Sequence, residues 1–195
     1  MASEPKIVKY LALPIQHCNS KILKRMNRRG DRVFLEELFG KLRSRIPGLV
    51  IRTSLITGLP GEGEEEFTEL CEFLREQRME RVGAFPISPK AGTPAAEMEY
   101  PDQEVAQQRA ELIEMLQSQI MDDYNASWIG KTTEVLIDGF DEEREQFYGR
   151  TYADSPDIDG KVWVASMEPL REGDFVMVQI DGCIDGDLSG FVLEE

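Results

Sequence analysis

Residues 49–62 read LVIRTSLITGLPGE, an apolar segment that runs directly into a turn of glycine and proline closed by an acidic residue. β-branched side chains are frequent in 49–57 and the only charge there is Arg52, which predicts a strand covered on both faces. After this turn, apolar residues recur at helical spacing, at Phe67, Leu70, Cys71 and Leu74. A buried strand, a tight turn and an amphipathic helix in succession are typical of a parallel α/β fold.

The flanking segments continue this alternation. Residues 7–15 and 82–88 are strand-like, while 21–29 and 31–46 carry helix caps or helical apolar spacing. The order predicts right-handed βαβ units and a parallel sheet of three strands, too few to close a barrel by themselves. A long helix that begins at 101–102 should link two domains. Its apolar stripe is expected at Val105, Leu112, Ile113, Leu116, Ile120 and Tyr124.

The last third of the chain has a different hydrophobic pattern. Short alternating segments are separated by glycine and aspartate turns, at 132–137, 147–152, 161–164, 175–180 and 188–193. Five strands of this length predict a small antiparallel barrel, closed or nearly closed, of the size of an OB-like module. We therefore expect an α/β part at 1–100, a linking helix at 101–127 and an all-β barrel at 128–195.

Charge divides the chain at the same place. The sequence holds 22 basic and 37 acidic side chains, a net charge of −15, and residues 128–195 account for −12 of it. A domain this acidic repels the phosphates of a nucleic acid and suits a basic protein as partner. A solvated surface that only keeps the protein in solution is the simpler alternative.

Composition also bears on the compartment. No apolar stretch is as long as a membrane-spanning helix, and the first residues lack the basic and apolar pattern of a signal peptide. The cysteines, Cys18, Cys71 and Cys183, are too far apart for a C-x-x-C motif and odd in number for a disulfide framework. We expect a cytoplasmic protein with no membrane partner.

Candidate ligand-binding residues follow from the predicted topology. Ligands of parallel α/β folds bind beyond the carboxyl ends of the strands, which nominates Gln16 and His17, the turn at 57–62 and the dipeptide at 88–89. His17 is the only histidine and has an unperturbed pKa near neutrality, but a packed structural histidine is the alternative. The glycines of the turn permit a close approach to a ligand, yet an ordinary strand-to-helix turn uses them too.

Other reactive side chains have simple explanations. The glutamates of 62–66 could be metal ligands or acid–base groups, but at a helix start they are better explained by the helix dipole. The basic residues of 21–29 could hold a phosphate or form a solvated face. One histidine is not enough for a confident Ser-His-Asp arrangement.

Taken together, these segments resemble the RimO-type branch of the radical S-adenosylmethionine methylthiotransferases, from about residue 6 to 193. The landmarks of the α/β part are Tyr10-Leu11, Pro14-Ile15-Gln16-His17, the runs at 22–29 and 52–62, Ser88-Pro89 and Gly92-Thr93-Pro94-Ala95. The runs at 149–156, 158–160 and 173–176 are similar to the TRAM module of that family. The number and order of these motifs make the resemblance specific.

The resemblance implies a radical reaction. In this family a 4Fe-4S cluster cleaves S-adenosylmethionine, and sulfur and a methyl group are added to an unactivated carbon, here the β-carbon of an aspartate in the twelfth protein of the small ribosomal subunit. It implies a partial (β/α) radical SAM barrel followed by a TRAM barrel that docks the basic protein. Ile56, Thr57 and Gly58 would lie beside the adenosyl group, with Gln16 and His17 as further cofactor contacts.

Two alternatives remain open. The sister MiaB-like branch modifies adenosine in tRNA, but its landmarks usually read Gln-Ser and Thr-Asp, where this chain has Gln16-His17 and Thr53-Ser54. With the charge argument, this difference makes tRNA an unexpected partner. The other alternative is a non-catalytic binding module whose TRAM barrel docks the basic protein.

The cysteines do not match the cluster motif of the family. That motif is C-x-x-x-C-x-x-C, whereas the cysteines of this sequence lie 53 and 112 residues apart. We therefore expect no catalytic residue and no metal ligand in this chain, which would be the carboxyl-terminal part of an enzyme and inactive alone. A truncated gene product, or half of a split enzyme completed by a chain with the amino-terminal half, would fit. The strand at 7–15 would then be an unpaired edge.

Overall fold

The computed structural model describes residues 1–193 and contains two compact units. The first unit comprises Met1–Glu4 and Leu11–Ile120, and the second comprises Pro5–Tyr10 and Met121–Glu195, of which Glu194 and Glu195 lie outside the described residues. The long helix contributes residues to both units. Each unit has its own apolar core, so the chain is a mixed α/β molecule with a separate β part.

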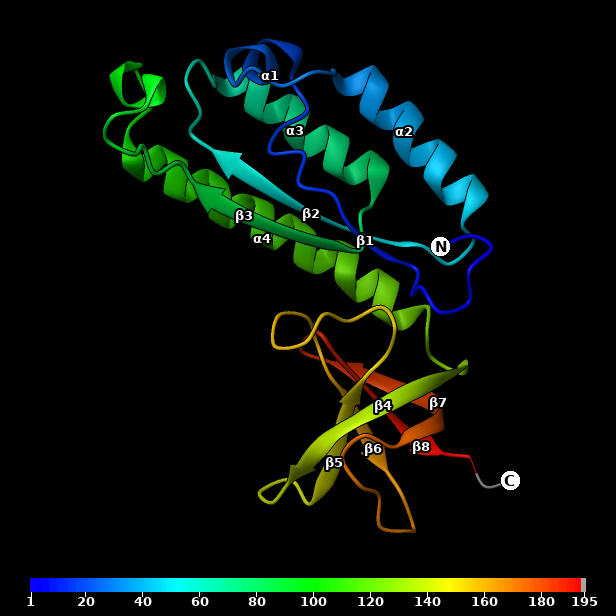
Figure 1. Cartoon of the computed structure of the whole chain (residues 1–195). Helices are drawn as coiled ribbons and strands as arrows, with labels where there is room; N and C mark the ends of the chain where they lie inside the picture. The colour runs from blue at the N-terminus through cyan, green and yellow to red at the C-terminus, as the bar shows by residue number, and fades with distance from the viewer. Residues whose placement is uncertain (194–195) are drawn as a thin grey trace. The chain divides into compact units, whose positions relative to one another are not determined.

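The first unit is built on a three-stranded sheet in the order β1-β2-β3 (Figure 1). β2 and β3 are parallel, as predicted, with Leu55 opposite Ala84. The strands are β1 (Tyr10–Ala12), β2 (Val50–Thr57) and β3 (Arg81–Pro86), and the helices are α1 (Ser20–Arg25), α2 (Arg32–Arg45), α3 (Glu64–Gln77), the short 3-10 helix η1 (Pro94–Glu97) and α4 (Gln103–Ala126).

β1 is shorter than the predicted 7–15 at both ends. Residues 7–9 precede it, and after the Leu13 N–H, which donates to the Arg52 carbonyl at 2.8 Å, the regular backbone ladder with β2 is interrupted. The Thr53 hydroxyl bridges the gap, since it accepts from the Ile15 N–H at 3.1 Å and donates to the Leu13 carbonyl at 2.8 Å. Pairing then resumes at Gln16, which forms a parallel bridge with Leu55.

Only one face of the sheet is covered, which corrects the expectation for β2. Thr53, Leu55 and Thr57 are buried, whereas the alternate residues Arg52, Ser54 and Ile56 are half-buried. The helices bury their apolar residues in one core on the Leu55 side. On the other side Phe85, the register partner of Ile56, is 56% exposed.

The buried face of α4 agrees with the predicted stripe at Ile113 and Ile120, which are buried, and differs at Leu112, which is 52% exposed. Ala106, Arg109 and Ala110, which were not predicted, are buried as well. Small alanines allow the helix axis to approach the sheet closely, so the face that packs is set by size as well as by hydrophobicity.

The second unit is a closed barrel in the order β4-β5-β6-β8-β7 (Figure 1). Its strands are β4 (Thr132–Asp141), β5 (Gln146–Arg150), β6 (Val162–Ala165), β7 (Phe175–Ile184) and β8 (Asp187–Val192). Alternate residues fill the interior with valine and isoleucine, as the alternating pattern predicts. The β6–β8 pair is parallel, so the barrel is not wholly antiparallel as expected. Within residues 1–193, no helix combines the length and apolar character needed to cross a bilayer.

Candidate functional site

The carboxyl ends of β1 and β2 meet at Gln16. The Gln16 N–H donates to the Ser54 carbonyl and its own carbonyl accepts from the Ile56 N–H, both at 2.9 Å. Its φ of 69° is in the left-handed region, and the chain leaves β2 after this residue. The side chains of Gln16 and Ile56 are both half-buried, so this end of the sheet offers them to a ligand.

His17 is fully buried beside this end of the sheet. Its Nδ1 accepts from the Asn19 N–H at 2.9 Å, so the neutral ring carries its proton on Nε2. Nε2 points toward Glu62 Oε2 at 3.6 Å, too far for a hydrogen bond, and has no other partner in the described structure. Burial lowers the pKa of His17 to about 4, so the ring is neutral at physiological pH.

Glu62 closes the turn that follows β2. Its buried carboxylate accepts from the Gly58 N–H at 3.0 Å and the Leu59 N–H at 3.4 Å, and from Arg109 Nη1 at 3.0 Å. Burial raises the pKa of Glu62, while the Gly58 N–H and the Arg109 guanidinium act in the opposite direction. The carboxylate is fully engaged, so its geometry suits bracing of the turn better than acid–base chemistry.

Arg109 connects the turn to α4. Its guanidinium also donates to the Glu62 carbonyl at 2.9 Å and to Glu64 Oε1 at 2.6 Å, and it lies 5.1 Å from the centre of the Phe67 ring. Sequence reasoning missed this residue. The signal was its position four residues before Ile113 and four after Val105, which places an arginine on the expected apolar stripe.

Thr57 and Gly58 fix the same turn against α4. The Thr57 hydroxyl donates to the Ala106 carbonyl at 2.7 Å. At Gly58, where φ is 72°, an added Cβ would lie 2.4 Å from the Ala106 Cβ, so only glycine fits. The five nominated residues therefore lie at one end of the sheet. Gln16 and Ile56 keep exposed surface, while His17, Thr57 and Gly58 are buried behind them.

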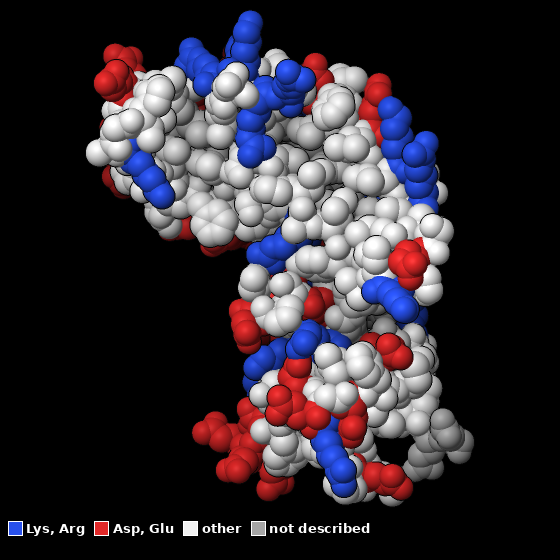
Figure 2. Space-filling model, in the orientation of Figure 1, with Lys and Arg blue, Asp and Glu red and all other residues white. Residues whose placement is uncertain are grey.

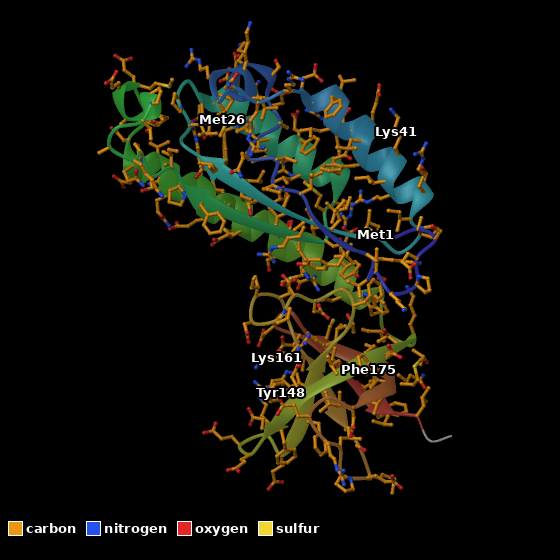
Figure 3. All side chains as sticks on the ribbon, viewed as in Figure 1. Met1, Met26, Lys41, Tyr148, Lys161 and Phe175 are labelled. Atoms are coloured by element: carbon orange, nitrogen blue, oxygen red, sulfur yellow. The ribbon has the colours of Figure 1, made fainter. Side chains whose placement is uncertain are left out.

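The barrel carries a second candidate binding surface, which is acidic. Most lysine and arginine side chains of this unit already contact an aromatic ring or a carboxylate. The β4–β5 hairpin exposes Glu142, Glu143 and Glu145, and Figure 2 shows acidic side chains gathered at one end of this unit. Four of the five basic side chains of 128–193 already face an aromatic ring or a carboxylate. Lys161, for example, lies 4.6 Å from the centre of the Tyr148 ring, and both residues are labelled in Figure 3.

Apolar side chains also lie on the outside of the barrel. Phe175 is 65% exposed and Met177 is 47% exposed on β7. Phe191 pairs in register with Gln179, and the Leu193 N–H donates to the Met177 carbonyl, so these residues extend the apolar surface onto β8 and its end. We call these four residues the β7 stripe. It is flanked by the exposed acids Glu134 and Asp181.

Comparison with known proteins follows this division into two units. Residues 2–74 match the model of the radical SAM superfamily, and residues 129–193 match that of the TRAM domain. Ribosomal protein uS12 methylthiotransferase RimO of Anaeromyxobacter sp. (strain Fw109-5) is 44% identical over 99% of this chain and 41% of its own length. By sequence, the chain is homologous to the RimO-type methylthiotransferases.

Further RimO relatives give the same picture. The RimO of Acetivibrio thermocellus is 41% identical over 100% of the chain and 43% of its own length, and that of Caldanaerobacter subterraneus subsp. tengcongensis is 46% identical over 95% and 42%. The chain thus spans about two fifths of the length of these RimO proteins. The chain is also similar to a solved structure of coproporphyrinogen III oxidase from Escherichia coli, a radical SAM enzyme, over 57% of this chain and 27% of the other, with 20% identity and a TM-score of 0.49.

The iron–sulfur cluster expected of a RimO-type enzyme finds no ligand set among the described residues. No group of three or more histidine, cysteine, aspartate or glutamate side chains is arranged for a metal there. Cys18 is buried and Cys71 half-buried, and burial raises the pKa of both thiols, which disfavours the thiolate that iron requires. Glu62 instead braces the turn after β2, and Glu66 caps the start of α3, where it accepts from the Gly63 N–H.

Proposed function

We propose that the chain is the part of a uS12 methylthiotransferase that forms one edge of the S-adenosylmethionine site and docks the protein substrate. The observation that carries the proposal is identity of 41 to 46% to RimO proteins across both units. The reaction replaces one hydrogen on the β-carbon of an aspartate in uS12 by a methylthio group. The three free cysteines suit the reducing cytoplasm, where ribosomal proteins are modified.

S-adenosylmethionine would lie against the exposed side of the strand ends. Ile56 offers an apolar surface to the adenosyl group, and the Gln16 amide can donate and accept hydrogen bonds. When bound and cleaved by one electron from the cluster of the complete enzyme, S-adenosylmethionine would supply the radical that removes hydrogen from the substrate. His17, Thr57 and Gly58 are buried behind Gln16 and Ile56 and would not touch the cofactor. They would hold the turn after β2 rigid and exclude water from it. The cluster would be held by residues outside 1–193, since the described ones do not fit it.

Enzyme assembled anaerobically from this chain and a polypeptide with the C-x-x-x-C-x-x-C motif tests the cofactor assignment. Methylthiolation of uS12 is read by mass spectrometry. Ile56→Asp should lower the rate at least about tenfold, because a carboxylate replaces the apolar surface that faces the adenosyl group. Ile158→Asp, at a position that is 63% exposed in the barrel, is the matched control and should leave the rate unchanged. Equal rates for both variants would contradict the assignment. Methylthiolated tRNA in place of uS12 would contradict the function.

The barrel is proposed to dock uS12 through charge and the β7 stripe. Ribosomal proteins that contact RNA are basic, and the barrel presents acids around exposed apolar side chains. Protein interfaces combine an apolar centre with a polar rim in this way. A nucleic acid would instead need free cations for its phosphates, and most cations of the barrel are engaged.

The stripe is tested with the full chain and purified uS12. The double variant Phe175→Ser, Met177→Ser should weaken binding about tenfold or more, because it removes the apolar centre of the interface. Met167→Ser is the matched control, since Met167 is 92% exposed on the same unit but lies outside the stripe. If the control weakens binding as much as the double variant, the stripe is not the docking surface.

A further inference from the structure

A separate pocket opens beyond the ends of β2 and β3. Its volume is about 340 Å³, near the lower end of the range for small-ligand sites. It is formed by α1, the turn after β2 and the segment that follows β3. Its lining includes Ile22, Arg25, Met26, Leu59, Ile87 and Tyr100. Met26, at the end of α1, is labelled in Figure 3.

The lining is largely apolar, with Asn27 and Thr93 as neutral polar residues and a single charge. Ile22 and Leu59 are buried in the wall, and the Tyr100 hydroxyl is engaged with the Ala95 carbonyl. Arg25 is the only charged residue among the described ones that line the pocket, and it has no ion-pair partner there. A ligand for this pocket therefore needs an apolar body and one negative group.

The position of Arg25 is built into the turn after β2. At Gly61, where φ is 80°, an added Cβ would lie 1.9 Å from Arg25 Nη1, so the guanidinium rests on the bare backbone of this glycine. A larger residue would displace the guanidinium from the pocket wall. The planar guanidinium offers paired donors, which match the two oxygens of a carboxylate.

The α1 side of the pocket is basic although the chain is strongly acidic, whereas the exposed acids Glu97 and Glu99 flank the lining residue Met98 on the other side. α1 and the residues after it carry Lys21, Lys24, Arg28 and Arg29 beside Arg25, in a chain of net charge −15. Figure 2 shows lysine and arginine side chains gathered over this part of the first unit. The basic side chains of α1 thus favour a negative group on the side of the pocket where Arg25 lies.

We propose that this pocket, which we name the Arg25 pocket, binds an acidic side chain of a polypeptide, with its carboxylate on Arg25 and apolar neighbouring residues against Ile22 and Leu59. That the ligand is a polypeptide rests on the proposed function, in which the substrate is a protein. The pocket would then select the residue presented beside the cofactor edge, whereas the barrel holds the body of the same protein.

Nuclear magnetic resonance of the ¹⁵N-labelled full chain tests the proposal with two blocked peptides. One has an aspartate between two leucines, and the other has asparagine in its place. The aspartate peptide should bind about tenfold more tightly and shift the amide signals of Leu59 and Gly61, because only it can pair with the guanidinium. Equal affinities, or shifts confined to other parts of the chain, would overturn the proposal.

Two variants locate the effect. Arg25→Gln should abolish the preference for aspartate, and Gly61→Ala should reduce it because the charge remains but the guanidinium is displaced. Arg29→Gln removes a neighbouring positive charge outside the pocket lining and should leave most of the preference. If Arg29→Gln abolishes the preference as fully as Arg25→Gln, the general basic field is responsible and the pocket is not a carboxylate site.

Competing ligands separate this inference from the proposed function. If S-adenosylmethionine alone gives the Leu59 and Gly61 shifts and displaces the peptide, the pocket belongs to the cofactor and the inference fails while the function stands. If the peptides behave as expected but the assembled enzyme modifies tRNA and leaves uS12 unchanged, the carboxylate site stands and the function fails.

Discussion

The buried Glu62–Arg109 pair of the first unit and the acidic hairpin of the second use charge in opposite ways. In the first unit Glu62 and Arg109 are buried and matched to each other and to the backbone of the turn after β2. On the barrel the carboxylates of the β4–β5 hairpin are exposed to solvent, and they act through the negative electrostatic field that they produce around the domain. Buried charges fix a geometry and are costly to unpair, whereas exposed charges alter association and hardly affect folding.

The largest expected effect is the loss of the Arg109 guanidinium. Arg109→Met should lower the free energy of unfolding by about 3 to 5 kcal/mol, because it leaves the Glu62 carboxylate buried without its cation. Urea denaturation of the full chain measures this. The matched control Lys41→Met removes an exposed pair with Glu37 and should cost less than about 1 kcal/mol. Similar losses for both variants would remove the contrast between buried and exposed charges on which the comparison of the two units rests.

A smaller effect is expected at the contact between the turn and α4. Gly58→Ala should lower the free energy of unfolding by about 2 to 4 kcal/mol, because the added Cβ overlaps Ala106 and alanine is strained at a positive φ. Gly92→Ala provides the control, since its φ is 80° but nothing lies within 4 Å of the added Cβ. Gly92→Ala should lower the free energy of unfolding by about 1 kcal/mol, from the strain of the positive φ alone. A Gly58 variant no less stable than the Gly92 variant would show that the turn can relax.

His17 predicts a pH dependence of intermediate size. Its folded pKa of about 4 lies below the unfolded value of 6.5, so the unfolded chain binds the proton more readily. The stability that neutral His17 contributes is complete above pH 6.5 and is lost as the pH falls toward 4, by up to about 3 kcal/mol. Denaturant titrations at several pH values should show this loss in the natural chain and a smaller one in His17→Gln. Parallel curves would contradict it.

The smallest effect on folding is expected on the barrel. Glu142→Gln with Glu143→Gln should change the free energy of unfolding by no more than about 0.5 kcal/mol, because both side chains are exposed. The association rate with uS12 should nevertheless fall several-fold at low ionic strength, and the difference should shrink as salt is added. Stopped-flow fluorescence measures the rate. An unchanged rate would mean that the hairpin lies outside the docking field.

The sequence predicted the elements well wherever a local pattern determines them. The strand at 49–57 and the helix that follows Glu62 correspond to β2 and α3, and the five alternating segments correspond to the five barrel strands. Turn residues and hydrophobic periodicity act over short distances, so a single sequence carries them.

The remaining features depend on partners far along the chain. Nothing local shows that β2 is covered on one face only, that Ala106 sets the face of α4, or that β6 pairs with β8 in parallel. The Glu62–Arg109 pair joins residues 47 positions apart. Its only signal in the sequence is that an arginine lies on the predicted apolar stripe of the long helix. The candidate site could therefore be located from topology, but its bracing could not.

The partner proposed for the barrel is a basic protein rather than RNA. Competition between uS12 and tRNA for the fluorescently labelled full chain, at low and at physiological ionic strength, tests it most directly. We expect uS12 to bind more tightly than tRNA at both ionic strengths and its binding to weaken as salt is added. Displacement of uS12 by tRNA at equal concentrations would contradict it.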